Sequence, residues 1–395
     1  MYFQALDNKQ DCYGFFYDGG LHRERLYSRT WRWSPNLDNS QAEFAYLYCG
    51  GLELSEVCPE DLKRDFQRVS DKMRAFLRSF SIAKVSVQEH CFYDLVPEKF
   101  LLHYFDLKNK ITQHVFESQS KPANYDFLSE LDQLTQRISQ QPLKIDRDTL
   151  RSFYHLPSTR SLIKALSQNR TSIDYNIFGT KTGRLATSPS SFPILTLKKE
   201  LRSVLRPKND WFVELDYNAA ELRTLLALLG KEQPTGDIHE WNAKNVYGGS
   251  VTRDEAKQRI FAWLYNPESA DRVSERSYPR QEALTQYWDG TKVKTPFQRE
   301  IAADKHHALN YLVQSTSSDL FLRKVLESDK ILQGRKTQIA YLLHDAVVFD
   351  FSMEDMDALK NVLTVFPQTK FGPFKINVSA GPDLGNMMEL VWKQS

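Results

Sequence analysis

The sequence predicts an α+β fold on three observations. Residues 211–216 (WFVELD) form an apolar run of strand length, and a helical pattern that ends at Gly230 follows it directly. Gln338–Leu343 and Val347–Phe351 flank a tight turn, as in a hairpin, and a last strand is expected at Phe374–Ala380. Because strands and helices are mixed without a regular βαβ repeat, the pattern favours an α+β core.

Composition bounds the class of protein. The chain has 395 residues, 41% hydrophobic and 26% charged, with 52 Lys+Arg against 50 Asp+Glu. This length exceeds a typical single core, so we expect more than one module. No run approaches the length of a membrane span, and the first residues lack the pattern of a secretory signal. We therefore expect a cytoplasmic protein without a membrane segment, and the net charge of +2 indicates no particular partner.

The four cysteines form no CxxC pair. They are Cys12, Cys49, Cys58 and Cys91. We expect free, mostly buried thiols in a reducing compartment. A zinc site built from the last three would need a fourth ligand such as His90, at irregular spacing, and is disfavoured.

The first half of the chain carries helices but little chemistry. Residues 1–59 are expected to form short strands and loops of unknown role. A long amphipathic helix begins at Glu60, and a second helix runs from Asn124 to Gln140, where Pro142 follows. The basic face of the first helix is either a solvated surface or a surface that follows phosphates.

Two acids stand at the ends of predicted strands. Asp216 closes the strand before a helix, and Asp345 lies on the hairpin turn. Each alone is typical of a helix cap or a turn. Paired on adjacent strands, they could hold two hard divalent cations that stabilise the attacking and leaving oxygens of a phosphoryl transfer. The backbone carbonyl of Tyr217 would add an oxygen ligand.

A second pattern lies between the two acids. Arg253, Lys257, Phe261 and Tyr265 follow each other at intervals of four residues, so a helix would place them on one side. Two cations followed by two aromatics suit neither a core nor a solvated face. The pattern favours cations that meet phosphates and aromatics that meet a base or sugar, with an irregular amphipathic face as the alternative.

Together these segments resemble motifs of the A family of DNA polymerases. Asp216–Arg223 (DYNAAELR) resembles its first palm motif DYSQIELR, the four-residue stripe resembles the finger-helix motif RxxxKxxxFxxxY, and His344–Ala346 (HDA) resembles its HDE motif. Three more segments stand in the family's order: Gly179–Pro189 (GTKTGRLATSP), Asp237–His239 (DIH) and Asn310–Phe321 (NYLVQSTSSDLF). The ordered set is far more specific than any one motif.

The resemblance implies a right-hand polymerase with an antiparallel-sheet palm, a helical thumb and reduced helical fingers. The implied order is an N-terminal extension, thumb, first part of the palm, fingers and second part of the palm, at residues 1–59, 60–168, 169–230, 231–305 and 306–395. The fingers are expected to be short because few residues separate Lys257 from Asn310.

The resemblance also implies the chemistry of the site. Asp216 and Asp345 would carry two Mg²⁺ ions, for which Mn²⁺ could substitute. Lys257 would bind the incoming triphosphate and donate a proton to the leaving pyrophosphate. Arg253 and His239 would hold the outer phosphates.

Sugar and base contacts follow from the same resemblance. Phe261 would lie against the nucleotide sugar and Tyr265 beside the templating pair. Glu221 would block a ribose 2′-hydroxyl and so select deoxynucleotides, although a glutamate near a helix N-terminus also has an ordinary structural explanation. Residues expected to contact the primer–template are Arg184, Lys198, Lys199, Arg202, Asn310, Gln314 and His344. The basic run 198–208 is alternatively a solvated loop.

Several positions depart from the family's pattern. Ala346 replaces the glutamate of HDE, Ala219 and Ala220 replace two residues of the palm motif, and His306 stands where an arginine is usual. The first 59 residues are too few for an exonuclease domain and carry no DxE motif, so we expect no proofreading.

The leading hypothesis is a compact, phage-like, template-directed DNA polymerase in the cytoplasm of a bacterial or phage-infected cell. Its partners would be primer–template DNA, deoxynucleoside triphosphates and accessory replication proteins. One alternative is a catalytically weak subunit that binds primer–template, for which Ala346 and the short fingers argue. A second is an enzyme like the single-subunit RNA polymerases, against which Glu221 argues.

Overall fold

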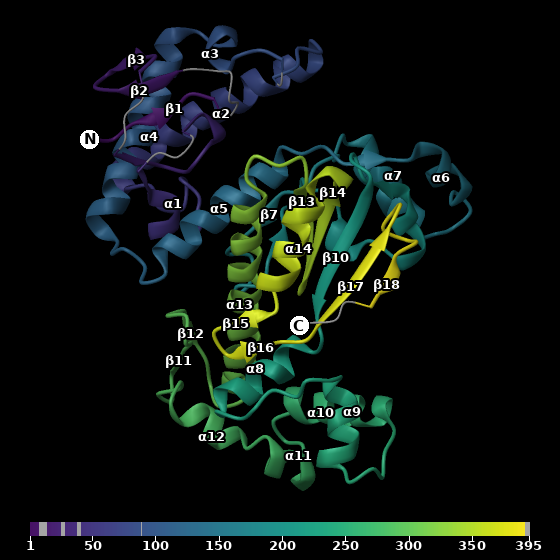
Figure 1. The fold of residues 1–395 in the computed structure, drawn as a ribbon. Helices are drawn as coiled ribbons and strands as arrows, with labels where there is room; N and C mark the ends of the chain where they lie inside the picture. Colours follow the sequence, from purple (N-terminus) through teal and green to yellow (C-terminus); the bar gives the residue numbers. More distant parts are fainter. Residues whose placement is uncertain (8–13, 25–27, 38–40, 88, 392–395) are drawn as a thin grey trace. The chain divides into compact units, whose positions relative to one another are not determined.

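The computed structural model describes residues 1–395 except 8–13, 25–27, 38–40, 88 and 392–395 (Figure 1). The chain forms two compact units, Met1–Arg137 and Ile138–Ser395. Within the described part of the chain, no helix is both long enough and apolar enough to cross a membrane. The finer division into five segments stays a prediction.

The first unit combines short strands with helices. Its strands are β1 Gln4–Ala5, β2 Phe15–Tyr17, β3 Gly20–His22, β4 Arg29–Thr30 and β5 Glu43–Phe44. Its helices are α1 Ala45–Tyr48, α2 Glu60–Ile82, α3 Phe92–Leu95, α4 Glu98–Ser118 and α5 Tyr125–Ser139. The strands β1, β2 and β3 form an antiparallel sheet, and β4 pairs with β5 in parallel. The two predicted helices of this half are therefore present, whereas α4 was not predicted.

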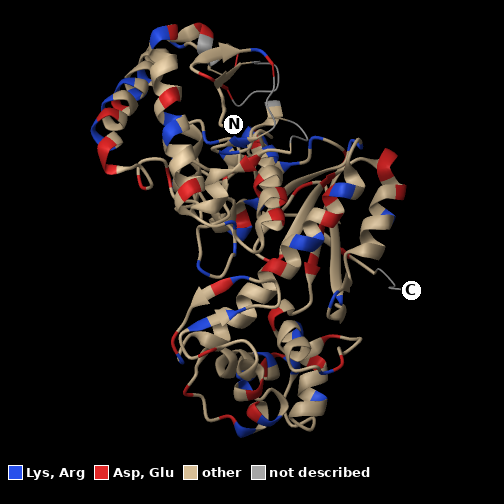
Figure 2. Ribbon diagram, turned by 90° about the vertical axis from the view of Figure 1, so that its left-hand side faces the viewer, with Lys and Arg blue, Asp and Glu red and all other residues tan. Residues whose placement is uncertain are grey.

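The basic face of α2 is paired with acids of the same helix. Lys63 lies 2.5 Å from Glu60, and two arginine–aspartate pairs, Arg68 with Asp65 and Arg74 with Asp71, follow along the helix. The opposite side of α2 buries Phe66, Val69 and Met73. Basic and acidic positions are interspersed along the ribbon (Figure 2). This arrangement favours the solvated-surface interpretation over one in which the helix follows phosphates.

The cysteines follow the expectation only in part. Cys49 and Cys58 are free and buried, and burial raises the pKa of both thiols. Cys91 is disulfide-bonded, so the expectation of a free thiol is wrong for this residue. Cys12 lies outside the described residues.

A five-stranded antiparallel sheet organises the second unit. Its strand order is β13-β14-β10-β17-β18. The strands are β10 Trp211–Tyr217, β13 Gln338–Leu343, β14 Ala346–Phe351, β17 Ile376–Gly381 and β18 Met388–Leu390. The predicted central strand and hairpin are present. Two boundaries differ, because Ala346 already pairs with β10 and the last strand begins at Ile376 rather than at Phe374.

Helices and small strand pairs make up the rest of the second unit. The helices are α6 Arg147–Ser152, α7 Thr159–Ser167, α8 Ala220–Leu228, α9 Ile238–Trp241, α10 Arg253–Tyr265, α11 Arg272–Ser277, α12 Arg280–Thr285, α13 Ala308–Leu332 and α14 Met356–Val365. The paired strands are β6 Lys144–Ile145 with β9 Leu205–Arg206, β7 Tyr175–Asn176 with β8 Ala186–Thr187, β11 Lys292–Lys294 with β12 Glu300–Ala302, and β15 Gln368–Thr369 with β16 Gly372–Pro373.

The two faces of β10 differ in chemistry. Val213, Leu215 and Tyr217 alternate on one face and are buried. The Tyr217 ring stacks on Phe366 with 4.8 Å between centroids, and its hydroxyl donates to the Phe366 carbonyl at 2.7 Å. Helices α13 and α14 lie along the sheet (Figure 1). This apolar packing fixes the strand, while the other face presents its acids.

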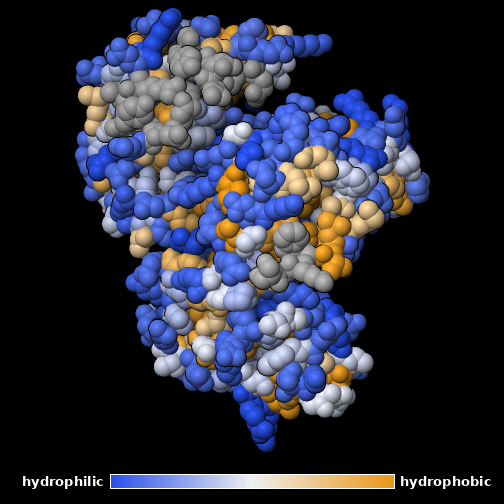
Figure 3. All heavy atoms as spheres, viewed as in Figure 1, coloured by the Kyte–Doolittle hydropathy of each residue, from blue (hydrophilic) through white to orange (hydrophobic). Residues whose placement is uncertain are grey.

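A second core holds α8 to α12 and the start of α13 together. Trp263 and Tyr278 are fully buried at its centre. Elsewhere in this unit, most of the surface is hydrophilic, with hydrophobic patches such as the one beside β17 and β18, where Met388 and Leu390 are exposed (Figure 3). The core ties α10 to α8 and α13, which carry several of the predicted site residues.

Tyr175 completes the hydrogen bonding of the edge strand β13. Its buried hydroxyl donates to the Leu342 carbonyl at 2.7 Å and accepts from the Leu342 N–H at 2.8 Å. We expect Tyr175→Phe to lower the free energy of unfolding by about 1–3 kcal/mol, because two buried backbone groups lose their partner. Urea unfolding measures the effect. The exposed Tyr154→Phe serves as the control, and an equal effect of both substitutions would contradict the account.

Candidate active site

Asp216 and Asp345 lie side by side at one end of the sheet. In the register of β10, Asp216 lies opposite Ala346 of β14 and opposite Asn377 of β17. Asp345 directly precedes Ala346 on the hairpin turn. The Asn377 amide donates to Oδ2 of Asp216 at 3.2 Å. The structure therefore brings together the two acids that the sequence analysis paired.

Nearby groups do not balance the negative charge of Asp216 and Asp345. Burial, and then the charge of Asp345, raise the pKa of Asp216 to about 7. Glu214, two residues earlier on the same strand face, has its pKa raised by burial and by Asp345, and Arg202 opposes the shift. Sequence reasoning missed Glu214, although the two-residue period of a strand would have placed it beside Asp216.

Oxygen ligands and excess negative charge suit a hard divalent cation. Among the residues that the structure describes, no group of three or more His, Cys, Asp or Glu could hold a metal ion. The position opposite Asp216, where the resemblance expects a third acid, is Ala346. The donor set is thus the aspartate pair with backbone oxygens, a ligand type that suits a hard divalent cation.

Four predicted site residues from separate segments form one hydrogen-bonded network. The buried Glu221 carboxylate accepts from the Arg184 guanidinium and from the Tyr265 hydroxyl. Tyr265 also hydrogen-bonds Gln314. Burial raises the pKa of Glu221, and the bond from Tyr265 and the charge of Arg184 oppose this. The turn that leads into α8 is tight, since Ala219 has φ 51°, a value that alanine rarely adopts.

A buried ion pair holds the loop that carries Arg184. Arg299 makes two hydrogen bonds to Asp319, at 2.7 and 3.1 Å, and both side chains are nearly inaccessible. Gly183 has φ 77°, and a Cβ there would lie 2.6 Å from the Arg299 guanidinium. The Ser318 hydroxyl donates to the Gly183 carbonyl at 3.1 Å. The pair between Arg299 and Asp319 was not predicted, because it depends on tertiary contacts alone.

The DIH segment is fixed by buried polar contacts. Asp237 caps α9, accepts from Asn218 at 2.9 Å and forms an ion pair with Arg253 at 2.8 Å. Burial would raise the pKa of Asp237, but the bonds from Arg253 and from backbone N–H groups hold it well below its usual range. The fully buried Arg223 donates to the carbonyls of Asn218, Pro234 and Gly236, which anchors the loop before α9.

Helix α10 begins and ends with the predicted stripe. Thr252 and Glu255 form a capping box at its start. On the stripe, Lys257 is exposed and the Phe261 ring stacks on Tyr265 with 5.8 Å between centroids. Phe261 also lies 5.6 Å from the His239 ring. The cationic half of the stripe is thus exposed, whereas Phe261 packs against the second core and Tyr265 reaches the Glu221 network.

His239 is buried beside positive charges. Burial, with help from Lys257 and Arg253, lowers its pKa from 6.5 to about 4, although Asp237 opposes the shift. Among the described residues, its Nδ1 has no hydrogen-bond partner. At neutral pH this residue is therefore an uncharged imidazole, which can hydrogen-bond a phosphate but adds no positive charge to the site.

The remaining predicted DNA contacts are spread over the second unit. Lys198 and Lys199 are exposed at a short 3-10 helix, and His344 is exposed on the hairpin turn with φ 55°. Arg206, within the same basic run, instead pairs with Asp146 at 3.2 Å and with Asp383 at 2.8 Å. Arg206 is thus a structural residue, whereas both lysines remain accessible.

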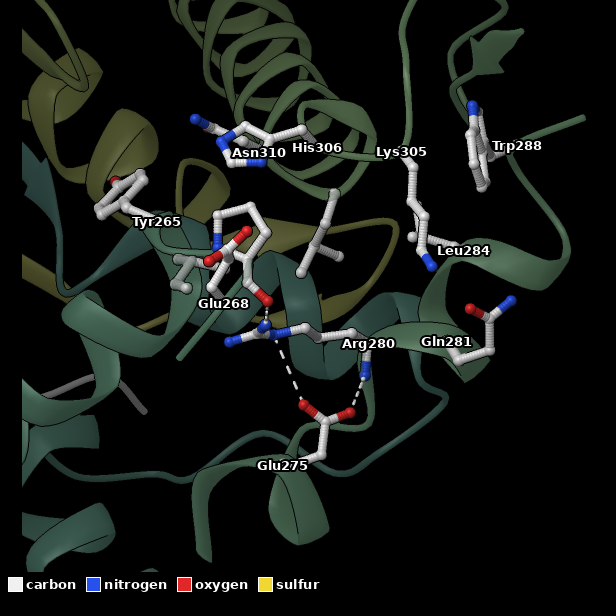
Figure 4. A pocket seen from close by; sticks show the side chains of 13 residues that line it. Tyr265, Glu268, Glu275, Arg280, Gln281, Leu284, Trp288, Lys305, His306 and Asn310 are labelled. Atoms are coloured by element: carbon white, nitrogen blue, oxygen red, sulfur yellow. Dashed lines mark hydrogen bonds and ion pairs between the residues drawn. The ribbon is translucent and has the colours of Figure 1, made fainter. Parts of the chain in front are cut away.

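A pocket of about 510 Å³ borders the network (Figure 4). Tyr265, His306 and Asn310 line one side of it, and the Arg280 side chain lies opposite, paired with Glu275. Trp288 and three leucines, Leu264, Leu284 and Leu309, form the apolar part of the wall, and Glu268, Gln281 and Lys305 add polar groups. Asn310, a predicted primer–template contact, and Tyr265 at the end of α10 both line the pocket.

The comparisons with known proteins support a polymerase fold. No family model matches the sequence. Among solved structures, the chain is similar to the POL domain of Pol1 from M. smegmatis in a complex with DNA primer-template and dNTP. The TM-score is 0.56 at 10% sequence identity, and the match covers 73% of this chain and 76% of that one. This similarity establishes the fold and leaves the chemistry to the site itself.

The state of His239 makes stability depend on pH. In the unfolded state His239 has an ordinary pKa and is protonated below about pH 6.5. In the folded state its pKa is about 4, so it stays neutral until the pH falls to about that value. Lowering the pH from 7 to 4.5 should therefore destabilise the wild type by about 2 kcal/mol more than His239→Gln. Urea unfolding at both pH values tests this, with the exposed His155→Gln as control. Equal losses in the wild type and His239→Gln would contradict the burial argument.

Proposed function

We propose that this chain is a template-directed DNA polymerase that extends a primer 3′ end by two-metal phosphoryl transfer. The observation that carries the proposal is the placement of Asp216, at the end of β10, beside Asp345, on the turn before the adjacent strand β14, in a polymerase fold. The M. smegmatis structure holds primer-template and dNTP, which supports the same classes of partner here.

In this proposal Asp216, Asp345 and the backbone carbonyl of Tyr217 hold Mg²⁺, or Mn²⁺ in its place. The metal ions would offset charge on the attacking and leaving oxygens of the transferred phosphoryl group. The Tyr217 side chain points to the opposite face of the sheet, so only its backbone is available as a ligand. Asn377 orients the Asp216 carboxylate through its 3.2 Å hydrogen bond.

The α10 stripe would receive the nucleotide. Lys257 and Arg253 are exposed cations one turn apart, and the Arg253 guanidinium is already held by Asp237. Lys257 would neutralise the triphosphate and protonate the leaving pyrophosphate. The neutral His239 would donate a hydrogen bond to an outer phosphate, and Phe261 would lie against the sugar.

The primer–template would lie along the remaining predicted residues. Arg184 and Gln314 converge on Tyr265 and Glu221, which supports a role in reading the minor groove at the primer end. The contacts at Lys198, Lys199, Arg202, Asn310 and His344 belong to this proposal.

The proposal also includes the division of the chain into segments: an N-terminal extension (1–59), thumb (60–168), palm (169–230 and 306–395) and fingers (231–305).

A second candidate is a catalytically weak primer–template-binding subunit. Ala346 lies directly opposite Asp216, so the expected third acid is missing at the point where it would help to hold the metals. Primer extension with Mg²⁺ and then with Mn²⁺ distinguishes the two candidates. Binding without extension under both metals would favour the subunit.

Removing either carboxylate should reduce primer extension without lowering the stability of the fold. We expect Asp216→Asn and Asp345→Asn to reduce primer extension by at least about 10³-fold, because each removes a ligand of the metals that stabilise the transition state. Primer–template binding should persist. Asp216→Asn should also raise the melting temperature without metal, because a buried carboxylate beside a like charge is removed.

The matched control is Glu389→Gln, an exposed acid on β18 of the same sheet. It should extend primers like the wild type. Extension at wild-type rates by either aspartate variant would remove the two-metal assignment. Wild-type protein that binds primer–template but extends it under neither metal would replace the polymerase proposal by the binding-subunit alternative.

Glu221 should act as a fixed barrier to ribonucleotides. Its carboxylate is held by Arg184 and Tyr265 and cannot swing away from a 2′-hydroxyl without breaking both contacts. We expect Glu221→Ala to raise the ratio of kcat/KM for ribonucleotides to that for deoxynucleotides by at least about tenfold. Tyr265→Phe, which keeps the carboxylate, should change this ratio far less. An unchanged ratio in Glu221→Ala would contradict the steric role.

A further inference from the structure

The first unit contains a pocket that the polymerase proposal does not use. Its volume is about 490 Å³, and β1, the segment after β4 and the helices α2, α4 and α5 contribute to its wall. Four aromatic side chains supply much of the lining: Trp31, Trp33, Tyr104 and Phe105. Trp31, Trp33 and Phe105 are buried, so these rings form a fixed wall. The pocket is large enough for one flat ring with a polar substituent.

One cation in this wall lacks an ion-pair partner among the described residues. Lys108 of α4 lines the pocket and is half-buried, and its ammonium group has no hydrogen-bond or ion-pair partner among the residues that the structure describes. Burial lowers its pKa to about 8, although Glu53 opposes the shift. By contrast, Lys110 on the same helix is exposed and pairs with Asp106 at 2.8 Å. A half-buried amine without a carboxylate is costly unless an anion joins it.

A second polar group in the wall is also left incomplete. Gln4 of β1 is 1% exposed, and its amide nitrogen donates to Asn109 at 2.9 Å and to Thr112 at 3.0 Å. Its Oε1 is buried and receives no hydrogen bond from the described part of the chain. Unsatisfied buried acceptors are rare in folded proteins. This amide is a ready partner for a donor group on a ligand.

We propose that this pocket binds one nucleotide unit, with the base against the aromatic wall and the phosphate on Lys108. Aromatic side chains bind bases through their faces, and an ammonium group binds phosphate as a point charge. The Oε1 atom of Gln4 matches an amino group at a base edge, whereas an aliphatic carboxylate would leave it unmatched. The site lies wholly within the first unit and stands independently of the polymerase proposal.

The arginine in the wall supports this assignment of the phosphate. Arg32 forms an ion pair with Asp132 at 2.6 Å, and its guanidinium lies 4.2 Å from the centroid of the Tyr46 ring. Its charge is therefore already matched by a carboxylate. Lys108 remains the cation in the described wall that an added anion would neutralise.

Binding to the full-length protein tests the proposal. The probes are deoxyadenosine monophosphate and a short oligo-deoxyadenosine, each titrated in EDTA so that metal-dependent binding at the second unit is suppressed. Amine acylation at pH 8, read by mass spectrometry, reports on Lys108 directly, and each bound probe should protect this residue. We expect Lys108→Met to weaken probe binding by at least about tenfold, because a charge-assisted contact to phosphate is lost. Lys110→Met is the matched control and should bind like the wild type.

The outcomes are separable. Protection by the mononucleotide identifies a free nucleotide as ligand, and protection by the oligonucleotide alone identifies a strand; both support the site. Equal affinity of Lys108→Met and the wild type for the probes would overturn the proposal. So would protection of Lys108 by octanoate, a simple aliphatic carboxylate, when neither nucleotide probe protects it. Asp216→Asn should retain the protection of Lys108 even when primer extension is lost, so a failure of one proposal is not a failure of the other.

Discussion

One electrostatic constraint governs the second unit: two carboxyl groups of like charge, Asp216 and Asp345, lie close together in a partly buried face of the sheet. Two like charges with little solvent between them oppose folding unless a cation or a proton joins them. The central strand tolerates this because its other face is packed against buried aromatic residues around Tyr217. The apolar side of β10 thus holds in place a polar side that would not assemble alone.

Polar contacts around this pair hold the surrounding segments in fixed positions. Arg299 with Asp319 holds the loop of Arg184, and Arg223 anchors the loop before α9. The Glu221 carboxylate then links Arg184 to the end of α10. These contacts orient the groups before any ligand binds, which lowers the reorganisation that a reaction would need.

Much of this site follows from the sequence because it depends on local patterns. The strand at Asp216, the hairpin at Asp345 and the helix from Arg253 to Tyr265 each have a period or a turn signal that short segments fix. What the sequence could not supply depends on register and on contacts between distant segments. Asn377 beside Asp216, the pairing of Arg299 with Asp319 and the pocket of Lys108 are of this kind. Helix α4 was missed because its apolar positions, with three in a row at Phe100–Leu102, spread over a broad face rather than a narrow stripe.

The most direct test of the account is a crystal structure of the protein with Mn²⁺, a primer–template ending in a dideoxynucleotide and the next matching nucleoside triphosphate. The account predicts anomalous manganese density bridging the carboxylates of Asp216 and Asp345, with the triphosphate reaching the ammonium group of Lys257. Nucleotide bound in the crystal without manganese at the two carboxylates would contradict the central claim.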